Sequence, residues 1–435
     1  MVIKSNIVGS FGVIDIILIM KKQVFLFVIT CCFLGCNSNN TQKNTVTKVT
    51  VNDETEFFEI DVRSALKISE ELVIPYSSFV ENIEYVPLQT TSLSLINEGK
   101  HGIISDISKK LIIADMNVFD RNTGHFLFKL GTRGQGPEEY TYVVDVEIDD
   151  EREEIYVLNA EPSKILTYSF DNKFKYTVGA LGSEIFYAMG NGNLLLSRPG
   201  SIRNGYYDYC VVNVDSKETV FKHISSLVKK SGDFSKCKGI MKAGSKEEPY
   251  FIVTGKNQFW KYNEKWCYYE YLTDSVFVIN NRFEPVSRGY LDMDDLKITE
   301  EQWKVGFFKQ NFFTWVIKSI SETTENITID IFSGNIVQKI FNNYLITYSK
   351  SDKKIKSVLN PIYEDDLAQG VAKSFLLKIS NENSKYYYIS PDEMNAEIEK
   401  KGAKSFSTGK AKEFKEIANR MKEDDNNVTC ILKLR

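Results

Sequence analysis

The sequence has little of what catalytic sites most often use: only three histidines occur among its 435 residues. A histidine-rich metal site or a His-based triad has few options, because His101, His125 and His223 are the whole supply. The Gly-x-Ser-x-Gly motif is missing, which removes the usual nucleophile signature of α/β-hydrolases. No Cys-x-x-Cys pair exists, so a zinc knuckle is unsupported. We therefore assign no catalytic residue, no metal and no cofactor.

Dense runs of basic residues are also lacking, and the formal net charge is −4. The first 35 residues contribute a net +2, from Lys4, Lys21 and Lys22 against Asp15, so the remainder carries −6. A mildly acidic chain is a poor nucleic-acid binder, because affinity for the phosphate backbone depends on clustered Lys and Arg. We therefore do not expect this protein to bind a nucleic acid.

The N-terminal region reads as an export signal. Lys21 and Lys22 form a basic start, Val24–Leu34 is an apolar run, and Gly35 precedes Cys36. This order is typical of a bacterial signal peptide, and the run is too short to span a bilayer. We expect residues 1–35 to be removed, with translation starting at Met1 or, more simply, at Met20.

Cys36 is the expected lipid attachment site. The segment Cys32–Cys36 resembles a bacterial lipobox, although Phe33 stands where Leu is usual. The alternative is an ordinary secretory signal with an incidental cysteine. Residues 36–70 begin with a polar stretch and are predicted to be the lipid attachment and flexible tether. By the same resemblance, the absence of Asp after Cys36 and of an acidic cluster favours the periplasmic face of the outer membrane.

Four cysteines remain after the lipidation site: Cys210, Cys237, Cys267 and Cys430. An oxidising compartment permits two disulfides with three pairings. We favour the simpler interpretation that they are small, mostly buried residues.

Short strand-like segments rich in aromatic and β-branched residues recur along the chain, separated by turn residues. One unit runs Gly102–Ile107, Leu111–Ala114, Val118–Asp120 and His125–Leu130, and the next unit repeats this order from Val143. Four strands in about 40 residues are typical of a β-propeller blade. Further strands are predicted at Phe312–Ile320, Ile327–Phe332, Ile336–Ile340, Tyr344–Tyr348, Phe375–Ile379 and Tyr386–Ile389.

Two helices interrupt this pattern. Ile298–Gln310 starts with a capping-box pattern, Thr299 and Gln302, and Phe414, Ile417, Ala418 and Met421 mark a second amphipathic helix. The last strand, Val428–Leu434, is expected to pair with Ile83–Leu88, because a closed ring leaves no exposed sheet edge. The runner-up fold is a pair of β-sandwiches.

The sharpest motif is Gly131–Tyr140, with sequence GTRGQGPEEY. Its glycines and proline favour a tight irregular turn that connects two blades, with Tyr140 packed inward. A functional interpretation places ligand-binding side chains of this motif at the mouth of the ring. These candidates are Arg133, Gln135, Glu138, Glu139 and Tyr140.

The same motif, together with Val118–Leu127, Ile83–Thr90 and Leu272–Phe277, resembles the six-bladed β-propeller lipoproteins of Bacteroidetes, which are related in fold to NHL-repeat proteins. The resemblance covers roughly Glu71 to Arg435. It implies six blades. Together with the predicted strands, it leads us to expect an all-β, six-bladed β-propeller over residues 71–435, closed by its N- and C-terminal strands, with a few short helices in insertions. It implies a lipid anchor and brings no catalytic residues.

We expect a lipid-anchored envelope protein that binds or scaffolds, with a carbohydrate, a peptide or an envelope protein as partner. The alternative is a propeller-type polysaccharide lyase or glycoside hydrolase, in which acidic pairs such as Asp149–Asp150 act as acid and base. A central cluster of Asp, Glu and His with a metal would favour the enzyme.

Overall fold

The computed structural model describes residues 57–96, 103–198, 201–202, 207–230, 237–244, 249–299, 301–302, 311–373, 378–379 and 384–435. The predicted signal peptide, Cys36 and the first part of the predicted tether lie outside these ranges. Of the predicted helix Ile298–Gln310, only the start is described. There Thr299 N–H donates to Gln302 Oε1 (2.9 Å) and Gln302 N–H donates to Thr299 Oγ1 (3.3 Å), which confirms the capping box.

Six sheets, each built on four antiparallel strands, make up most of the described fold, and one of them, β19–β22, carries a fifth strand, β1 (Phe58–Ile60), in parallel. The first three follow one another in the chain: β4–β7 (Ser105–Ile107, Leu111–Ala114, Asn117–Asp120, Phe126–Lys129), β8–β11 (Val143–Asp149, Glu154–Asn159, Lys164–Ser169, Phe174–Gly179), and β12, β13, β15 and β16 (Ile185–Gly190, Asn193–Ser197, Tyr209–Asn213, Glu218–His223). The next two are β19–β22 (Gln258–Tyr262, Lys265–Glu270, Ser275–Ile279, Pro285–Leu291) and β23–β26 (Thr314–Glu322, Asn326–Asn335, Ile340–Ser349, Ile355–Leu359).

The sixth sheet joins the two ends of the domain. It has the order β28 (Lys378–Ile379), β29 (Ser384–Ile389), β30 (Val428–Leu434) and β3 (Val80–Pro87). Strands β3 and β30 are antiparallel, with Ile83 opposite Leu432 and Tyr85 opposite Cys430. The predicted closure is therefore confirmed.

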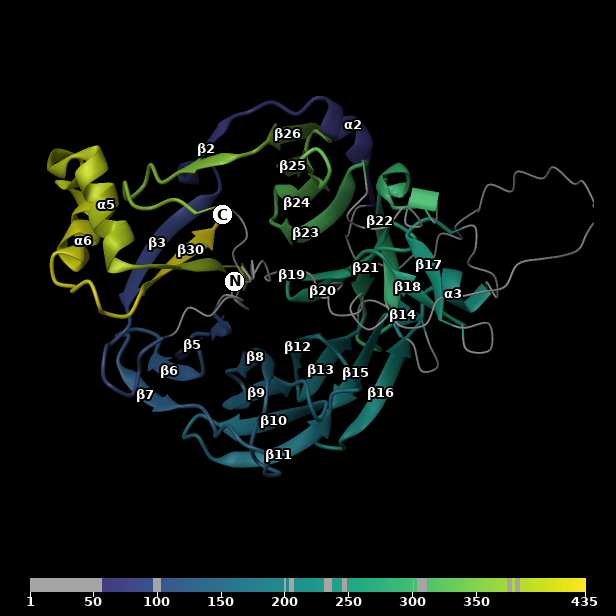
Figure 1. The fold of residues 1–435 in the computed structure, drawn as a ribbon, viewed down its shortest axis with the longest axis horizontal. Helices are drawn as coiled ribbons and strands as arrows, with labels where there is room; N and C mark the ends of the chain where they lie inside the picture. Colours follow the sequence, from purple (N-terminus) through teal and green to yellow (C-terminus); the bar gives the residue numbers. More distant parts are fainter. Residues whose placement is uncertain are drawn as a thin grey trace, which may run out of the picture. The chain divides into compact units, whose positions relative to one another are not determined.

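The sheets are arranged as blades around a common centre (Figure 1). Strand β8 contacts both β4 and β12, and β19 contacts β23, so the first strand of each of these blades is the innermost. This arrangement is a six-bladed β-propeller, as the sequence predicts. The sandwich alternative is excluded.

Apolar residues fill the space between neighbouring blades. All six residues of β9 are buried, because a middle strand of a blade is covered on both faces. One such cluster joins Tyr156 and Leu158 of β9 to Phe186 of β12 and Leu194 of β13. The core is thus divided among the blade junctions, and side chains at a junction hold two blades in register.

Several elements lie outside the six blades. They are a three-stranded sheet of β14 (Ser201–Ile202), β18 (Pro249–Val253) and β17 (Ile240–Gly244), a parallel pair of β2 (Val73–Pro75) and β27 (Ile362–Glu364), and the short helical segments η2 (Tyr76–Ser78), α3 (Ser226–Lys230), η3 (Asp294–Leu296) and η5 (Ala403–Phe406). Helices α5 (Pro391–Lys401) and α6 (Gly409–Ala418) lie beside the closing blade (Figure 1). In α6, Phe414, Ile417 and Ala418 are buried, as predicted.

The folded chain begins before Glu71, the start that the sequence analysis gave to the propeller. Strand β1 (Phe58–Ile60) runs parallel to β22, and helix α2 (Val62–Lys67) follows it. Ile60 and Val62 are fully buried, and the Asp61 carboxylate caps α2 by accepting from Ser64 N–H at 2.8 Å. Residues 58–67, which were assigned to the flexible tether, therefore belong to the domain, because their apolar side chains cover the edge of a blade.

One predicted strand is wrong. Residues 336–339 of the segment Ile336–Ile340 form the turn between β24 and β25, with Lys339 at φ 55°. Its apolar side chains stay near the surface, and Val337 is 49% exposed.

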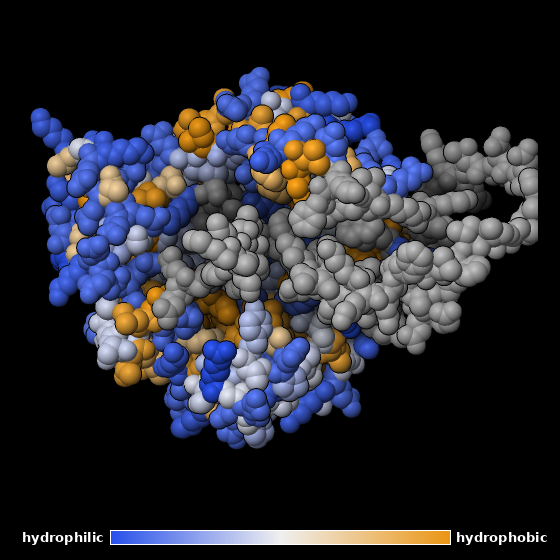
Figure 2. All heavy atoms as spheres, in the orientation of Figure 1, coloured by the Kyte–Doolittle hydropathy of each residue, from blue (hydrophilic) through white to orange (hydrophobic). Residues whose placement is uncertain are grey.

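Hydrophobic residues on the visible face form separate patches among hydrophilic ones (Figure 2), as is usual for a surface in contact with water. Within the described ranges, no helix is both long enough and apolar enough to cross a membrane. No disulfide joins the described cysteines Cys210, Cys237, Cys267 and Cys430, and all except Cys237 are buried.

Candidate functional site

The motif Gly131–Tyr140 connects β7 of the first blade to β8 of the second, which confirms its interpretation as an inter-blade turn. Tyr140 is 5% exposed and lies in the apolar cluster between these blades. Its hydroxyl donates to the carbonyl of Leu130 at 3.2 Å. Tyr140 is thus a packing residue, and the sequence places it inward correctly.

The loop is folded back on itself. Gly134 N–H donates to the carbonyl of Tyr140 (2.9 Å), and Tyr140 N–H donates to the carbonyl of Thr132 (3.1 Å). The Glu139 carboxylate accepts from Gly136 N–H at 2.8 Å and lies directly over Gly134. A Cβ atom on Gly134 would lie 2.0 Å from Glu139 Oε2, so glycine at this position makes room for the carboxylate.

The outer hairpin of the second blade, formed by β10 and β11, holds the loop in place. Tyr168 of β10 donates its hydroxyl to the carbonyl of Glu138 at 2.8 Å. In the turn, Asn172 accepts from Gly131 N–H (2.9 Å) and donates to the carbonyl of Lys129 (3.0 Å). These contacts bind one blade to the next at their outer strands.

A pocket of about 460 Å³ lies between the loop and this hairpin. Its lining combines loop backbone, two carboxylates and two aromatic rings: Gly131, Thr132, Gly136, Pro137, Glu138, Glu139, Tyr168, Asn172 and Phe174. The rings of Tyr168 and Phe174 meet edge to face, with centroids 6.0 Å apart. A concave site with aromatic rings and a few polar acceptors is suited to a small organic ligand.

Burial raises the pKa of Tyr168 to about 12, and the nearby Tyr140, Glu138 and Glu139 add to the effect. The Tyr168 hydroxyl therefore stays protonated and keeps donating to the loop. It serves as a fixed wall of the pocket.

The predicted ligand-binding residues lie in three different environments. Glu138 and Glu139 line the pocket, Arg133 and Gln135 are exposed on the same loop, and Tyr140 is buried behind it. The sequence placed the side chains at the mouth of the ring. The pocket lies instead beside the outer strands β10 and β11, because the connection starts at β7, the outer strand of its blade.

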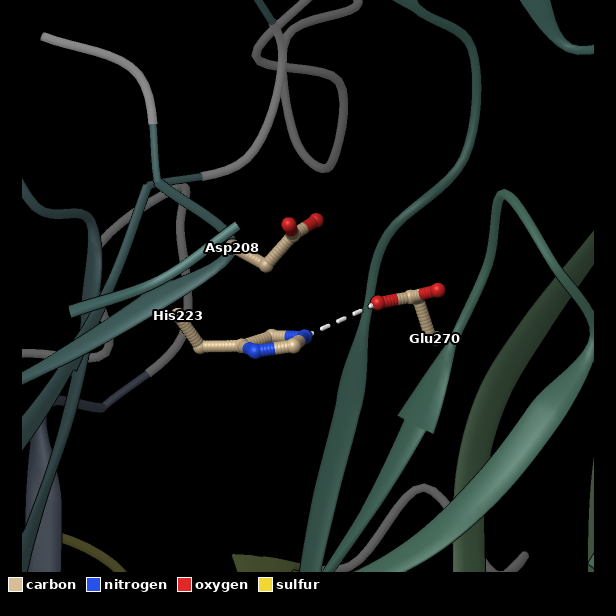
Figure 3. A group of neighbouring side chains, drawn as sticks. All are labelled: Asp208, His223 and Glu270. Carbon is tan, nitrogen blue, oxygen red and sulfur yellow. Dashed lines mark hydrogen bonds and ion pairs between the residues drawn. The ribbon is translucent and has the colours of Figure 1, made fainter. Parts of the chain in front are cut away.

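A second polar group, which no sequence motif indicates, is formed by Asp208, His223 and Glu270 (Figure 3). Asp208 immediately precedes β15, His223 ends β16, and Glu270 ends β20 of the following blade. One nitrogen or oxygen atom from each residue lies within 4.8 Å of the others. No local motif marks these residues, since only the packing of two blades brings them together.

Hydrogen bonds orient Glu270 strongly. Burial by itself would raise the pKa of this carboxyl, but hydrogen bonds from His223, Thr273 and Ser225 outweigh it and hold the pKa below its usual value. Glu270 is therefore a carboxylate at neutral pH, 1% exposed and aimed at His223.

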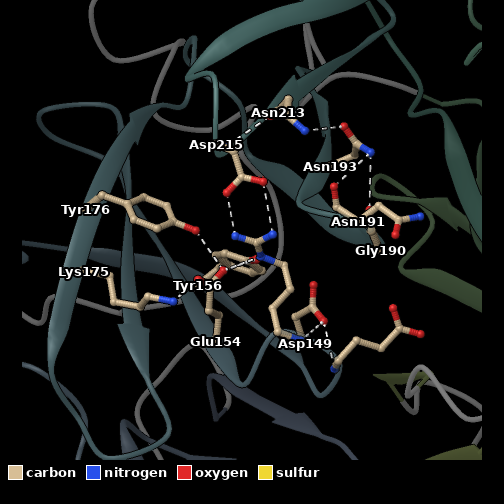
Figure 4. Close-up of polar contacts among 12 residues, drawn as sticks. Asp149, Glu154, Tyr156, Lys175, Tyr176, Gly190, Asn191, Asn193, Asn213 and Asp215 are labelled. Carbon is tan, nitrogen blue, oxygen red and sulfur yellow. Dashed lines mark hydrogen bonds and ion pairs between the residues drawn. The ribbon is translucent and has the colours of Figure 1, made fainter.

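A third group connects the second and third blades (Figure 4). Arg152 donates to Glu154 at 2.9 Å and to both oxygens of Asp215 at 2.7 and 3.1 Å. Tyr156 and Tyr176 each donate a hydroxyl to Glu154 at 2.8 Å. Burial works against the charge of Glu154, but these donors hold its pKa at about 2. The positive and negative side chains of this group pair with one another. We therefore interpret the group as a structural contact that holds the two blades together.

Comparisons with known proteins agree with the fold. The family model of a domain of unknown function, DUF4934, matches residues 57–433. No curated protein matches the chain. An exported protein of Bacteroides fragilis is 14% identical, with a TM-score of 0.56, over 88% of this chain and 99% of that chain. A DUF4221 member from Bacteroides vulgatus is 9% identical, with a TM-score of 0.41, over 82% and 97%. The similarity to the Bacteroides fragilis protein supports the propeller architecture and no more specific property of this chain.

Proposed function

The chain belongs to the DUF4934 family, and we propose that it is a lipid-anchored protein of the cell envelope that binds a carbohydrate in the pocket at Gly131–Glu139. The observation that carries this proposal is the pocket itself, in which two aromatic rings and two carboxylates face a volume of about 460 Å³. Loops fixed to a rigid ring are a common place for binding sites.

The chemistry of the lining favours a neutral sugar. The partly exposed ring of Phe174 offers a flat apolar surface for the C–H face of a pyranose. The exposed carboxylate of Glu138 accepts hydrogen bonds from sugar hydroxyls, and such charge-assisted bonds are strong. Two carboxylates at the pocket repel acidic sugars. A peptide with a basic side chain is the competing ligand.

The proposed location of the protein in the cell rests on the predicted signal peptide. Export through the signal in residues 1–35 and acylation of Cys36 tether the domain to the outer membrane at its periplasmic face. The structurally similar protein from Bacteroides fragilis is described as exported, which agrees with this assignment.

An enzymatic function has less support. A glycosidase needs two carboxylates that flank the scissile bond. In the pocket, Glu139 is engaged by the backbone of its own loop, at Gly136. Asp208, His223 and Glu270 are an acidic and histidine cluster, but they come from other blades than the pocket.

The test is a glycan array with neutral and acidic oligosaccharides, followed by calorimetry with the best ligand. Phe174→Ala should lower the affinity by about tenfold or more, because a stacked aromatic ring contributes on the order of 1–3 kcal/mol. Phe341→Ala is the matched control, since Phe341 is a 55% exposed phenylalanine outside the pocket. Equal ligand affinities of the two variants would refute the assignment of this pocket as the binding site. Preference of the protein for basic peptides would change the proposed ligand from a carbohydrate to a peptide.

A further inference from the structure

Asp208, His223 and Glu270 occupy a junction between two blades and are shielded from water. Asp208 and Glu270 are each 1% exposed, and the side chain of His223 is 12% exposed. His223 Nε2 lies 3.1 Å from Glu270 Oε1. One nitrogen or oxygen atom from each of Asp208, His223 and Glu270 lies within 4.8 Å of the others. Three residue types that bind metals thus converge at one point.

The charge of the group favours a cation. Two buried carboxylates, those of Asp208 and Glu270, lie close to one imidazole. A divalent cation would neutralise both carboxylates and leave the imidazole neutral.

The two oxygens of Glu270 have different partners. Oε2 accepts short hydrogen bonds from the hydroxyls of Thr273 (2.5 Å) and Ser225 (2.9 Å). Oε1 accepts from His223, and only weakly from Tyr268 at 3.3 Å. One oxygen is therefore firmly held, and the loosely bonded one faces the imidazole. Hydrogen bonds to one oxygen of a metal-ligating carboxylate orient the other oxygen toward the metal in the same way.

Asp208 is also held by hydrogen bonds. Its Oδ2 accepts a short hydrogen bond from the backbone N–H of Ser225, whereas Oδ1 accepts a long one, 3.4 Å, from Asn257. Ser225 thus holds one oxygen of each carboxylate, through its N–H for Asp208 and its hydroxyl for Glu270. A single residue orients both acids toward the same point.

The imidazole of His223 is also fixed. Its ring stacks on Tyr209, with centroids 5.1 Å apart and 30° between planes, and meets the edge of Tyr268 at 5.9 Å. These contacts point Nε2 toward Glu270 (Figure 3). The ring cannot turn away without losing both aromatic contacts.

We propose that Asp208, His223 and Glu270 form a binding site for one divalent transition-metal ion, with Zn²⁺ as the test ion. One imidazole nitrogen and two carboxylate oxygens suit Zn²⁺ better than Ca²⁺ or Mg²⁺, which prefer oxygen ligands alone. Tetrahedral zinc holds its ligand atoms about 3.3 Å apart. The His223–Glu270 separation of 3.1 Å is close to this value, and a shift of at most about 1.5 Å brings Asp208 into range.

The experiment measures zinc bound to the complete chain, purified without a histidine tag. After incubation with zinc and extensive dialysis, elemental analysis should find one zinc per chain, and zinc should raise the melting temperature. His223→Gln should lower zinc affinity by at least tenfold, while its amide still donates to Glu270 and preserves the fold. His125→Gln is the matched control, since His125 lies in the β6–β7 connection of another blade.

A second variant guards against misfolding. Thr273→Val removes one hydroxyl from the outer oxygen of Glu270 without removing a ligand, and it should weaken zinc binding about tenfold. Stoichiometric zinc that is lost in His223→Gln and weakened in Thr273→Val supports the site. No zinc retention by the wild-type chain, or equal retention by His223→Gln and His125→Gln, overturns it and leaves the group as a hydrogen-bonded joint between blades.

Discussion

Lys385 is a fully buried amine on β29 of the closing blade. Burial lowers its pKa to about 7, and the charge of Asp330 on the neighbouring blade opposes this shift only in part. Burial also raises the pKa of Asp330, with Lys318 and Lys385 working against it. The protein therefore keeps a lysine at a position where its charged form is disfavoured.

This lysine makes stability depend on pH in a defined direction. Between pH 7 and 10.5 the unfolded chain holds the Lys385 proton and the folded chain has lost it, so stability rises with pH. In urea titrations, the advantage of Lys385→Met over wild type should shrink as pH rises from 7 to 10, by at most about 1.4 kcal/mol per pH unit. A constant difference over this range would contradict the buried amine.

Gly134 makes room for the Glu139 carboxylate, and its replacement should disturb the pocket. In Gly134→Ala the new methyl group displaces Glu139 from Gly136 N–H, at a cost of about 1 kcal/mol in the free energy of unfolding. Carbohydrate affinity should fall with it. Gly179→Ala is the matched control, because a Cβ there meets nothing within 4 Å. Chemical denaturation and calorimetry of both variants measure the difference, and similar effects would refute the role of Gly134.

Single residues were predictable where a local rule acts on them. Tyr140 follows a Gly- and Pro-rich turn and precedes a strand, so its inward position follows from the chain itself. Asp208, His223 and Glu270 are 15 and 47 residues apart in succession, and each looks like an ordinary strand-end residue. Their meeting depends on how two blades pack, which no local pattern records.

At the scale of elements, an ion-pair network connects two blades. Arg288 of β22 forms a bidentate pair with Glu322 of β23, with one bond at 2.6 Å. Lys350 and the Trp260 indole also reach Glu322, at 2.6 and 3.0 Å. Arg288 is 3% exposed and Glu322 is likewise 3% exposed. Buried charges of this kind depend on one another.

Removal of one partner should therefore be costly. Arg288→Met leaves the buried Glu322 with Lys350 as its remaining ion-pair partner and should lower the free energy of unfolding by about 3 kcal/mol. Arg121→Met, which breaks the pair with the 43% exposed Glu84, should cost about 1 kcal/mol or less. Urea denaturation measures both. A smaller loss for Arg288→Met than for Arg121→Met would be inconsistent with the network.

The regular blades were predictable because two-residue periodicity and turn residues repeat in each hairpin. Strand β1 and helix α2 were not, because Phe58 and Ile60 belong to a strand whose parallel partner, β22, lies far away in the sequence. They gain their stability by covering β22 and by contact with other blades. Residues 336–339 resemble a strand because they include apolar side chains, but in the structure they form a turn near the surface.

At the scale of the whole molecule, β3 and β30 close the ring, and the proposed lipid attachment site, Cys36, precedes it in the sequence. Cys36→Ser should abolish labelling by radioactive fatty acid and move the protein from the membrane fraction to the soluble fraction. Cys32→Ser is the matched control, since residue 32 leaves with the predicted signal peptide. Fatty-acid labelling that persists in Cys36→Ser would reject the anchor.

The central claim is that a carbohydrate binds at the rim of the ring, between the loop Gly131–Tyr140 and the hairpin of β10 and β11. Hydrogen exchange of the complete chain, followed by mass spectrometry with and without the best oligosaccharide from the array, tests it most directly. The account predicts slower exchange in residues 131–140 and 168–174. Unchanged exchange there, with protection at the inner strands β4, β8 or β12, would contradict it.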